Sequence, residues 1–261
     1  MRAERIWEID LLRAFAILLM VVFHLVFDLA EFVGLRINYL SGFWYWEGKT
    51  AALLFIFLAG ISSGFSRNNI KRGLKVLAFG FLITLFTYLV FPEQYIRFGI
   101  LHFLGTCMLL FPLLLRLPNI LLLIGTVIIA AAALPLQKLI VNTFWLLPVG
   151  LMYSGYTSYD YYPLVPYLAV FILGILSYKT YYYRRQSLLV ALTGEKAPEA
   201  EKQEQGKGAP ENGNSSNGRN TRRLRTWVRY ISKNSLAIYL LHQPVLVALV
   251  FLGKELVEAL G

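Results

Sequence analysis

Long apolar runs alternate with short polar segments along the whole chain, and the length of the runs is the first clue to the fold. A run of about 20 mostly apolar residues is long enough for an α-helix to cross the hydrocarbon core of a bilayer. The pattern predicts spans at about 8–30, 50–66, 74–91, 98–115, 118–135, 162–178 and 234–252. We therefore expect an all-α fold, a polytopic membrane helix bundle of about seven transmembrane helices.

Segment 136–153 is apolar enough to be a further span, but the charge distribution argues against it. Short cytoplasmic segments of membrane proteins collect Lys and Arg. Seven spans with the N-terminus in the cytoplasm put most of the basic residues inside, whereas a crossing at 136–153 would send the basic loop 179–233 outside. We expect a multi-pass protein of the cell membrane with its C-terminus outside, and an interfacial or re-entrant segment at 136–153.

The composition agrees with a membrane protein and excludes several other classes. Of the 261 residues, 57% are hydrophobic and 15% charged, whereas soluble domains carry about 25% charged residues. The net charge of +10 is explained by the inner loops, so we expect the lipid bilayer and no nucleic acid as a partner. A single cysteine, Cys107, excludes an internal disulfide, and the oligomeric state stays open.

The polar stretch near residue 200 divides the chain into three predicted parts. Residues 193–221 lack aromatic and large aliphatic side chains and cannot bury enough surface to become ordered. We predict a membrane helix bundle at 1–185 with the first six spans, a disordered cytoplasmic insert at 186–226, and the last transmembrane helix of the same bundle at 227–261. The basic stretch 221–229 is typical of a segment on anionic headgroups, with contact to an anionic cofactor as the alternative.

Ionisable residues inside the first span carry the candidate chemistry. Asp10, Arg13, His24 and Asp28 all lie there, although a charge near the centre of a spanning helix costs roughly 2.5–3.5 kcal/mol. At about 100° per residue, Arg13, His24 and Asp28 share one helix face, with His24 about 16 Å along the axis from Arg13. That face must look into a polar interior.

His24 with Asp28 is the predicted catalytic pair. A carboxylate bonded to one imidazole nitrogen fixes the tautomer and leaves the other nitrogen to take a proton from a hydroxyl or amine. An ion pair that only joins two helices is the alternative. No GxSxG, HExxH or P-loop motif occurs, and the separated histidines lack the tight spacing of a metal site, so no metal is expected.

Three further residues are expected near this pair, as contacts to substrate or as positioning residues. His102 and Asp160 fall near the outer ends of their spans, at the level of His24 and Asp28, and His242 falls beneath them near mid-membrane. Ionisable groups in spans face the bundle interior and commonly mark a site or pathway. The sequence thus predicts a polar cluster towards the outer side.

Five blocks of sequence, in order, resemble one known family. They are RIWEIDLLRAFAILLMVVFHLVFDL, FIFLAGISSGFSR, FGILHFLG, YDYYPLVPYLAVFILG and NSLAIYLLHQPVL. They are similar to the heparan-alpha-glucosaminide N-acetyltransferase catalytic-domain family, in its bacterial branch, over the membrane core without the 186–226 insert. The spacing from Arg13 to His24 also resembles membrane acyltransferases that O-acetylate surface polysaccharides.

The resemblance implies a membrane-bound acetyltransferase that moves an acetyl group from cytosolic acetyl-CoA to a sugar or cell-envelope acceptor on the outer side. In that family an asparagine and a histidine serve the reaction. Here His24 stands in the asparagine's place, and Asn38 or Tyr39 falls near the histidine's place. The resemblance leaves open whether the acceptor is an amine or a hydroxyl.

Basic residues at the cytoplasmic mouth fit the phosphates of coenzyme A. Arg13, Arg67, Lys71 and Arg72 could hold them in charge-assisted pairs, although the turn at 67–75 is equally explained by topology alone. The alternative function is a proton-coupled transporter or flippase in which the same His and Asp residues relay protons.

Overall fold

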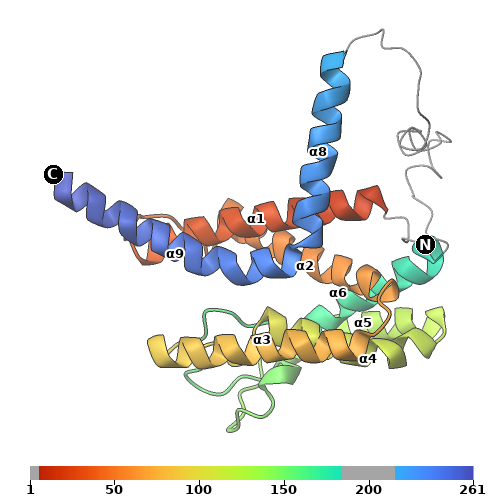
Figure 1. Ribbon diagram of the computed structural model, residues 1–261. Helices are drawn as coiled ribbons and strands as arrows, with labels where there is room; N and C mark the ends of the chain where they lie inside the picture. Colours follow the sequence, from red (N-terminus) through yellow and green to blue (C-terminus); the bar gives the residue numbers. More distant parts are fainter. Residues whose placement is uncertain (1–5, 184–214, 261) are drawn as a thin grey trace. The chain divides into compact units, whose positions relative to one another are not determined.

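The structure, a computed structural model, describes residues 6–183 and 215–260, and these residues form eight α-helices and no strand. The helices are α1 (Trp7–Glu31), α2 (Gly42–Gly64), α3 (Asn69–Val90), α4 (Ile100–Arg116), α5 (Asn119–Leu136), α6 (Leu164–Ser177), α8 (Ser215–Lys233) and α9 (Ser235–Leu260). A 3-10 turn, η1 (Leu147–Val149), and a π-helical turn, η2 (Tyr178–Tyr182), complete the list. The predicted all-α class is confirmed (Figure 1).

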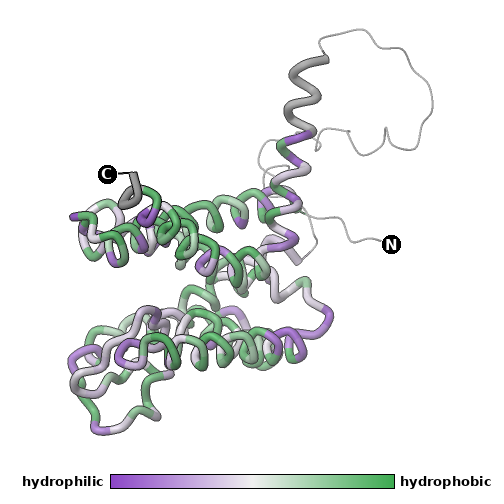
Figure 2. Tube along the Cα trace, turned by 60° about the vertical axis from the view of Figure 1, so that its left-hand side comes forward, coloured by the Kyte–Doolittle hydropathy of each residue, from purple (hydrophilic) through white to green (hydrophobic). Residues whose placement is uncertain are grey.

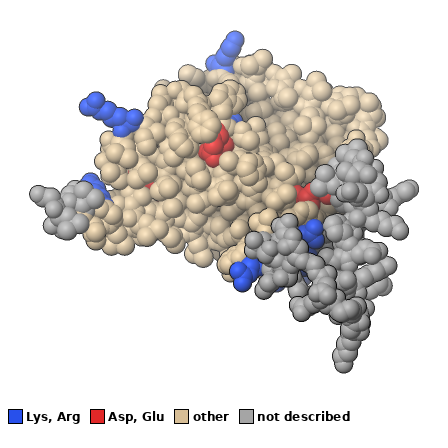
Figure 3. Space-filling model, turned by 90° about the horizontal axis from the view of Figure 1, so that it is seen from above, with Lys and Arg blue, Asp and Glu red and all other residues tan. Residues whose placement is uncertain are grey.

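Five of these helices are long and apolar enough to cross a membrane: α1, α3, α5, α6 with η2, and α9. Figure 2 shows them as predominantly hydrophobic along their length, and few charged side chains interrupt the face drawn in Figure 3. The other two predicted spans correspond to α2, whose first turns carry Glu47 and Lys49, and to the 17-residue α4. The helical membrane bundle is thus confirmed, and the total of seven spans stays a prediction.

The helices fall into two compact units, each described here by itself. The first contains α1, the first half of α2 up to Phe55, α8 and α9. In it, α1 packs along both α8 and α9, and Figure 1 shows α1 and α9 side by side. Ile17, Met20 and Ala51 form its buried apolar centre, and Ile238 and Tyr239 of α9 pack against it, so the last helix packs with the first.

The second unit runs from Ile56 to Tyr183, and close helix contacts at glycine hold it together. In this unit α3 packs on α4, and α5 packs on α6. A side chain at Gly60 would collide with the backbone of Phe171 and Gly174 in α6, and one at Gly73 with the backbone of Gly105 in α4. The small residues of the second predicted span therefore allow close packing, as such residues do between membrane helices.

Segment 136–153 contains no spanning helix. It follows the end of α5 as irregular chain, with one isolated bridge between Ile140 and Met152 and the short turn η1. Tyr161 donates a hydrogen bond to the carbonyl oxygen of Leu147 at 2.8 Å, which ties the segment to the chain before α6. An interfacial position on the outer side stays a prediction.

The predicted insert differs from the structure at its C-terminal end. Residues 184–214 lie outside the described residues, but α8 begins at Ser215, so residues 215–226 are helical. In the second half of α8, Val228 and Ser232 are buried while Leu224 and Trp227 are exposed. This two-sided pattern supports a packed helix. The helix was not predicted from the sequence because residues 215–221 contain few apolar side chains. The division into parts at 1–185, 186–226 and 227–261 stays a prediction.

Candidate active site

The two histidines of the first unit meet where α1 packs along α9. The rings of His24 and His242 lie edge to face with centroids 4.8 Å apart. Both side chains are half-buried. His24, which the helix spacing placed on an inward face, thus has its ring against a polar side chain of another helix.

Backbone carbonyls define the protonation pattern of both rings. His24 Nδ1 lies 2.8 Å from the carbonyl oxygen of Met20, and His242 Nδ1 lies 2.6 Å from that of Tyr239. A carbonyl oxygen can only accept, so each neutral ring carries its proton on Nδ1 and keeps a lone pair on Nε2. Nε2 of His242 is buried and has no hydrogen-bond partner among the described residues. The unit therefore presents basic imidazole nitrogens inside a helix interface.

Asp28 lies one turn beyond His24 and is fully buried, with 0% of its surface exposed. Its Oδ1 accepts a hydrogen bond from Gln243 Nε2 at 2.6 Å. Asp28 Oδ2 and Gln243 Oε1 are buried and have no hydrogen-bond partner among the described residues. These two atoms, like Nε2 of His242, are polar groups in an apolar interface that a bound polar molecule could satisfy.

The expected hydrogen bond from His24 to Asp28 is corrected by this geometry. Met20 carbonyl, rather than the carboxylate, accepts from His24 Nδ1, and Gln243 is the partner of Asp28. The reason is helical geometry: a histidine in a helix can reach the carbonyl four residues earlier. The pairing of Asp28 with Gln243 depends on the register of α1 against α9. The spacing of residues within α1 does not predict that register.

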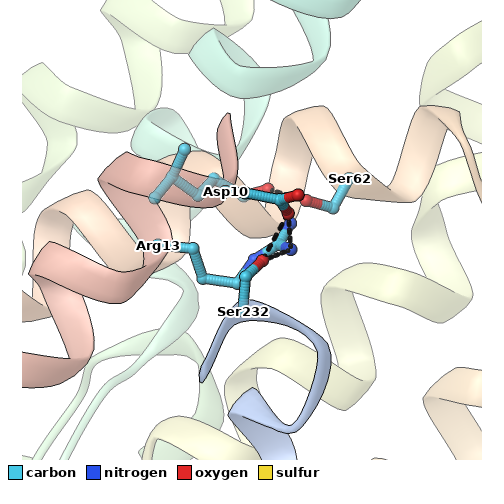
Figure 4. Close-up of polar contacts among 5 residues, drawn as sticks. Asp10, Arg13, Ser62 and Ser232 are labelled. Carbon is cyan, nitrogen blue, oxygen red and sulfur yellow. Dashed lines mark hydrogen bonds and ion pairs between the residues drawn. The ribbon is translucent and has the colours of Figure 1, made fainter. Parts of the chain in front are cut away.

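Arg13, the third residue on the face, is part of a polar network at the other end of α1 (Figure 4). Its Nη1 donates to Ser232 Oγ at 2.7 Å, and Ser232 donates to Asp10 Oδ1 at 2.5 Å. Arg13 Nη1 also lies 3.6 Å from Asp10 Oδ1. The three side chains link α1 to the end of α8, so Arg13 has a structural role here, and its contact with coenzyme A stays a prediction.

The remaining predicted cofactor residues lie together where α3 begins. Arg67, Lys71 and Arg72 are exposed, and Asn68 caps the helix by accepting from the backbone N–H of Lys71 at 2.9 Å. Amide hydrogens and the positive end of the helix dipole favour anions at such a terminus. Lys71 and Arg72 place two positive charges in this first turn, where the helix dipole disfavours them. The same two charges add to the attraction for a phosphate.

His102 and Asp160 are brought together in the second unit, at the start of α4. Asp160 Oδ2 accepts from the backbone N–H of Ile100 at 2.9 Å, and a side chain at Gly99 would collide with it. His102 Nδ1 accepts from the N–H of Gly99 at 3.3 Å, while Nε2 lies 3.2 Å from the Thr84 hydroxyl. Nδ1 of His102 thus caps the start of α4, and Nε2 joins α4 to α3 through Thr84. The larger cluster with His24 and Asp28 stays a prediction.

Burial raises the pKa of Asp160 from 3.8 to about 6, and the hydrogen bond from Ile100 opposes the shift. Desolvation is the larger cause because it disfavours the charged form more than one N–H stabilises it. Asp160 therefore keeps its proton to a higher pH than an ordinary aspartic acid does.

Asn38 lies in the connector between α1 and α2. It is exposed, and its side chain accepts from the backbone N–H of Leu40 at 3.1 Å. The neighbouring Tyr39 donates to Glu31 at 2.5 Å and packs its ring on Phe27. Asn38 thus shapes a turn in this structure, and its role in a reaction stays a prediction.

Three residues of the first unit were missed from the sequence. Gln243 and Ser232 are the polar partners of the first helix, and Glu47 of α2 is buried with both carboxylate oxygens lacking a hydrogen-bond partner among the described residues. The sequence signal was available for Gln243, which follows His242 directly in an otherwise apolar span. Across 6–183 and 215–260, no three His, Cys, Asp or Glu side chains are grouped as metal ligands are.

The fold and these buried polar groups define a multi-pass membrane protein with a polar centre between helices. Residues 5–202 match the family model described as heparan-alpha-glucosaminide N-acetyltransferase, catalytic, and the chain belongs to that family. A comparison with the curated proteins and one with the solved structures each gave no significant match.

The matched range differs in one respect from the five blocks that suggested the family. It includes the first four blocks and runs on into the polar stretch as far as residue 202, but the block at 234–246 lies beyond it. His242 and Gln243 thus come from a helix outside the matched part of the chain. The family identifies a membrane acetyltransferase, and it does not assign these two residues.

Proposed function

We propose that the protein transfers an acetyl group from acetyl-CoA to a sugar or other cell-envelope acceptor on the outer side of the membrane. The observation that carries the proposal is the contact of His24 with His242 in a helix interface that also holds buried, unsatisfied polar atoms of Asp28 and Gln243. Membership of the family supports the class of reaction. Buried polar atoms without partners are costly and are expected where a ligand satisfies them.

His24 serves in this proposal as the proton acceptor. Its Nδ1–H is held by the Met20 carbonyl, so Nε2 is the nitrogen that can take a proton from the acceptor as that group attacks the thioester carbon. The carbon–sulfur bond then breaks, and the proton passes from His24 to the departing thiolate. His242 places a second imidazole beside the ring of His24. Asp28 and Gln243 bind polar groups of the acceptor.

The basic turn at the start of α3 is our candidate for the phosphates of coenzyme A. Arg67, Lys71 and Arg72 are exposed beside a capped helix N-terminus, which suits a polyanion. Arg13 is retained as a second candidate, although the network with Ser232 and Asp10 already occupies part of its guanidinium.

The test is acetyl transfer in membranes that contain the wild type or His24→Gln, with labelled acetyl-CoA and a panel of envelope saccharides. Loss of a positioned general base lowers the rate by about 10²–10⁴-fold, so we expect His24→Gln to fall to near background. Leu25→Ala, at the exposed neighbouring position, is the control and should keep its rate. Full transfer by a normally inserted His24→Gln variant contradicts the assignment, and gradient-driven flux without any transfer supports the transporter.

A further inference from the structure

Helix α8 is the most amphipathic of the described helices, and it is not among those apolar enough to cross a membrane. Its contacts with α1 account for only part of its surface, because most side chains in its second half are exposed. Low overall hydrophobicity, many basic residues and exposed aromatic rings are typical of a helix that lies in the interface between membrane and water.

Helix α8 runs across the direction of its neighbours in the first unit. Asn234 alone separates its last residue from the first residue of α9. Figures 1 and 2 both show α8 rising from this joint across the lengths of α1 and α9. Both of those helices are long and apolar enough to cross a membrane. When they cross the bilayer, α8 extends along the membrane surface.

Contacts with the start of α1 place α8 at one end of these two spans. Ser232 of α8 donates a hydrogen bond to Asp10 Oδ1 at 2.5 Å. The guanidinium carbon of Arg225 lies 5.6 Å from the ring centroid of Trp7, the first residue of α1. Helix α8 therefore lies where both α1 and α9 begin, on the side that the positive-inside rule predicts to be cytoplasmic.

One face of α8 is buried and another is turned away from the unit. Val228 and Ser232, one turn apart, are the buried residues of its second half. At about 100° per residue, Arg223, Trp227 and Tyr230 fall within about 60° of one another and about 100° or more from Val228. Trp227 is 64% exposed and Tyr230 60%, so neither ring is packed inside the unit.

Arg223, Trp227 and Tyr230 form the outward face of α8, and they combine groups that suit a lipid headgroup. The two rings lie edge to face with centroids 6.3 Å apart, so they make one aromatic patch. Trp and Tyr are enriched at membrane surfaces because their rings have an apolar body and a polar tip. The exposed guanidinium of Arg223 can donate two parallel hydrogen bonds to a phosphate.

We propose that α8 lies on the cytoplasmic surface of the membrane and binds anionic phospholipid, such as phosphatidylglycerol, through its outward face. The two rings lie at the level of the headgroups, and Arg223 binds a headgroup phosphate. Arg225, Arg229 and Lys233 are exposed on the opposite flank, and they add positive charge close to the surface. An anionic leaflet attracts such charges, whereas a zwitterionic lipid carries no net charge.

A bilayer fits the outward face better than a soluble anion such as coenzyme A does. A soluble anion can pair with Arg223, but it leaves the exposed rings of Trp227 and Tyr230 in water. A bilayer takes up the rings and the guanidinium together. Because Ser232 joins α8 to Asp10, the lipid-bound helix also holds the start of α1.

The experiment measures quenching of Trp227 fluorescence by brominated phospholipids in the purified full-length protein in nanodiscs. The emission of Trp227→Phe is subtracted, in the wild type and in each variant, so that Trp227 alone is followed. Brominated phosphatidylglycerol and brominated phosphatidylcholine are compared, and the ratio of their effects gives the preference for anionic lipid. We expect a clear preference for phosphatidylglycerol. One basic residue near an anionic surface contributes about fivefold, so Arg223→Gln should lower the preference by about that factor.

Two variants and a change of salt serve as controls. Lys138→Gln removes a positive charge at an exposed position of the second unit and should keep the preference of the wild type. Arg223→Lys keeps the charge and should retain most of the preference. Added salt screens exposed charges and should reduce the preference of the wild type, which tests the charge without any substitution if Arg223→Gln folds poorly.

Three results overturn the proposal. Quenching by neither lipid shows that α8 does not lie on the membrane, and equal quenching by both shows that its outward face does not select anionic lipid. A folded Arg223→Gln variant with unchanged preference is the second kind of contradiction, because the guanidinium then has no part in the selection. The third is a change of Trp227 emission on adding coenzyme A to phosphatidylcholine nanodiscs, without quenching by either lipid, since the outward face then binds a soluble anion.

Discussion

Single polar atoms decide what the centre between α1 and α9 can do. Asp28 keeps one carboxylate oxygen on Gln243 and the other unsatisfied, and His24 is oriented by a carbonyl rather than by a carboxylate. An imidazole on a carbonyl has a defined tautomer but gains no negative partner for its protonated form. His24 is therefore suited to a proton that it passes on quickly, since the partner of Nδ1 is a neutral carbonyl and not a carboxylate.

At the residue scale we predict strong coupling between Asp28 and Gln243. Gln243→Leu leaves a buried carboxylate without a donor, and such a loss costs about 1–3 kcal/mol or more for a charged group. Asp28→Leu should likewise destabilise the protein, but the double variant should cost clearly less than the two single costs together. Thermal unfolding in one detergent measures all three.

The matched control for this cycle is Gln94→Leu, because Gln94 is exposed in the connector after α3. Surface changes of that kind stay within about 0.5 kcal/mol. Strictly additive costs for Asp28→Leu and Gln243→Leu contradict the hydrogen bond as a source of stability.

Elements were easier to predict from the sequence than the contacts between them. Hydropathy alone predicted helices close to α1, α3, α4, α5, α6 and α9, since the bilayer sets the length of a spanning segment. The common face of Arg13, His24 and Asp28 followed from the helical period. Their partners Ser232 and Gln243 lie more than 200 residues away in the chain, and only the packing of α1 against α8 and α9 defines that register.

Two other elements show why sequence patterns were incomplete. Helix α8 was not predicted, because residues 215–221 have the composition of a polar linker and the basic stretch 221–229 was interpreted as a segment on anionic headgroups. Glu47 was overlooked because it stands among the aromatic residues of a predicted connector, whereas the structure includes it in α2. Whether a single acidic side chain in the first turns of a helix is buried depends on which other helices pack against it. The composition of the segment does not predict those contacts.

At the element scale the start of α4 should respond to pH through Asp160. Its pKa in the folded protein, about 6, lies above the ordinary value of 3.8. A raised pKa means that the folded state binds the proton more tightly, so the contribution to stability is complete below pH 3.8 and is lost as the pH rises through 6. The shift of about 2 pK units corresponds to a loss of at most about 3 kcal/mol.

Asp160→Asn isolates this effect, because the amide oxygen can still accept from the N–H of Ile100 and carries no charge. We expect the variant to match the wild type near pH 4 and to be more stable at pH 8. Melting temperatures measured at both pH values check the sign. A variant that loses stability equally at both pH values shows that packing, rather than the charge, is what matters at position 160.

Over the whole molecule, the part of the chain that matches the family and the part that carries the candidate site are not the same. The match ends at residue 202, yet α9 supplies His242 and Gln243 to the first unit and packs along α1. A helix far along the chain thus completes the surroundings of the first one. The site proposed for this protein therefore includes residues that lie beyond the matched range.

The orientation of the whole chain in the membrane is the last prediction, and the lone cysteine makes it easy to test. Cys107 is buried with 0% exposure, so the wild type should give little background with a membrane-impermeant maleimide. Lys71 and Glu255 are exposed, and the positive-inside rule places the first in the cytoplasm and the second outside. In intact cells we expect Glu255→Cys to be labelled at once and Lys71→Cys only after permeabilisation.

Arg36→Cys, in the exposed connector after α1, should behave like Glu255→Cys, because an outward-running first helix delivers it to the same side. Labelling of Lys71→Cys in intact cells would reverse the topology, and with it the side from which an acceptor reaches His24.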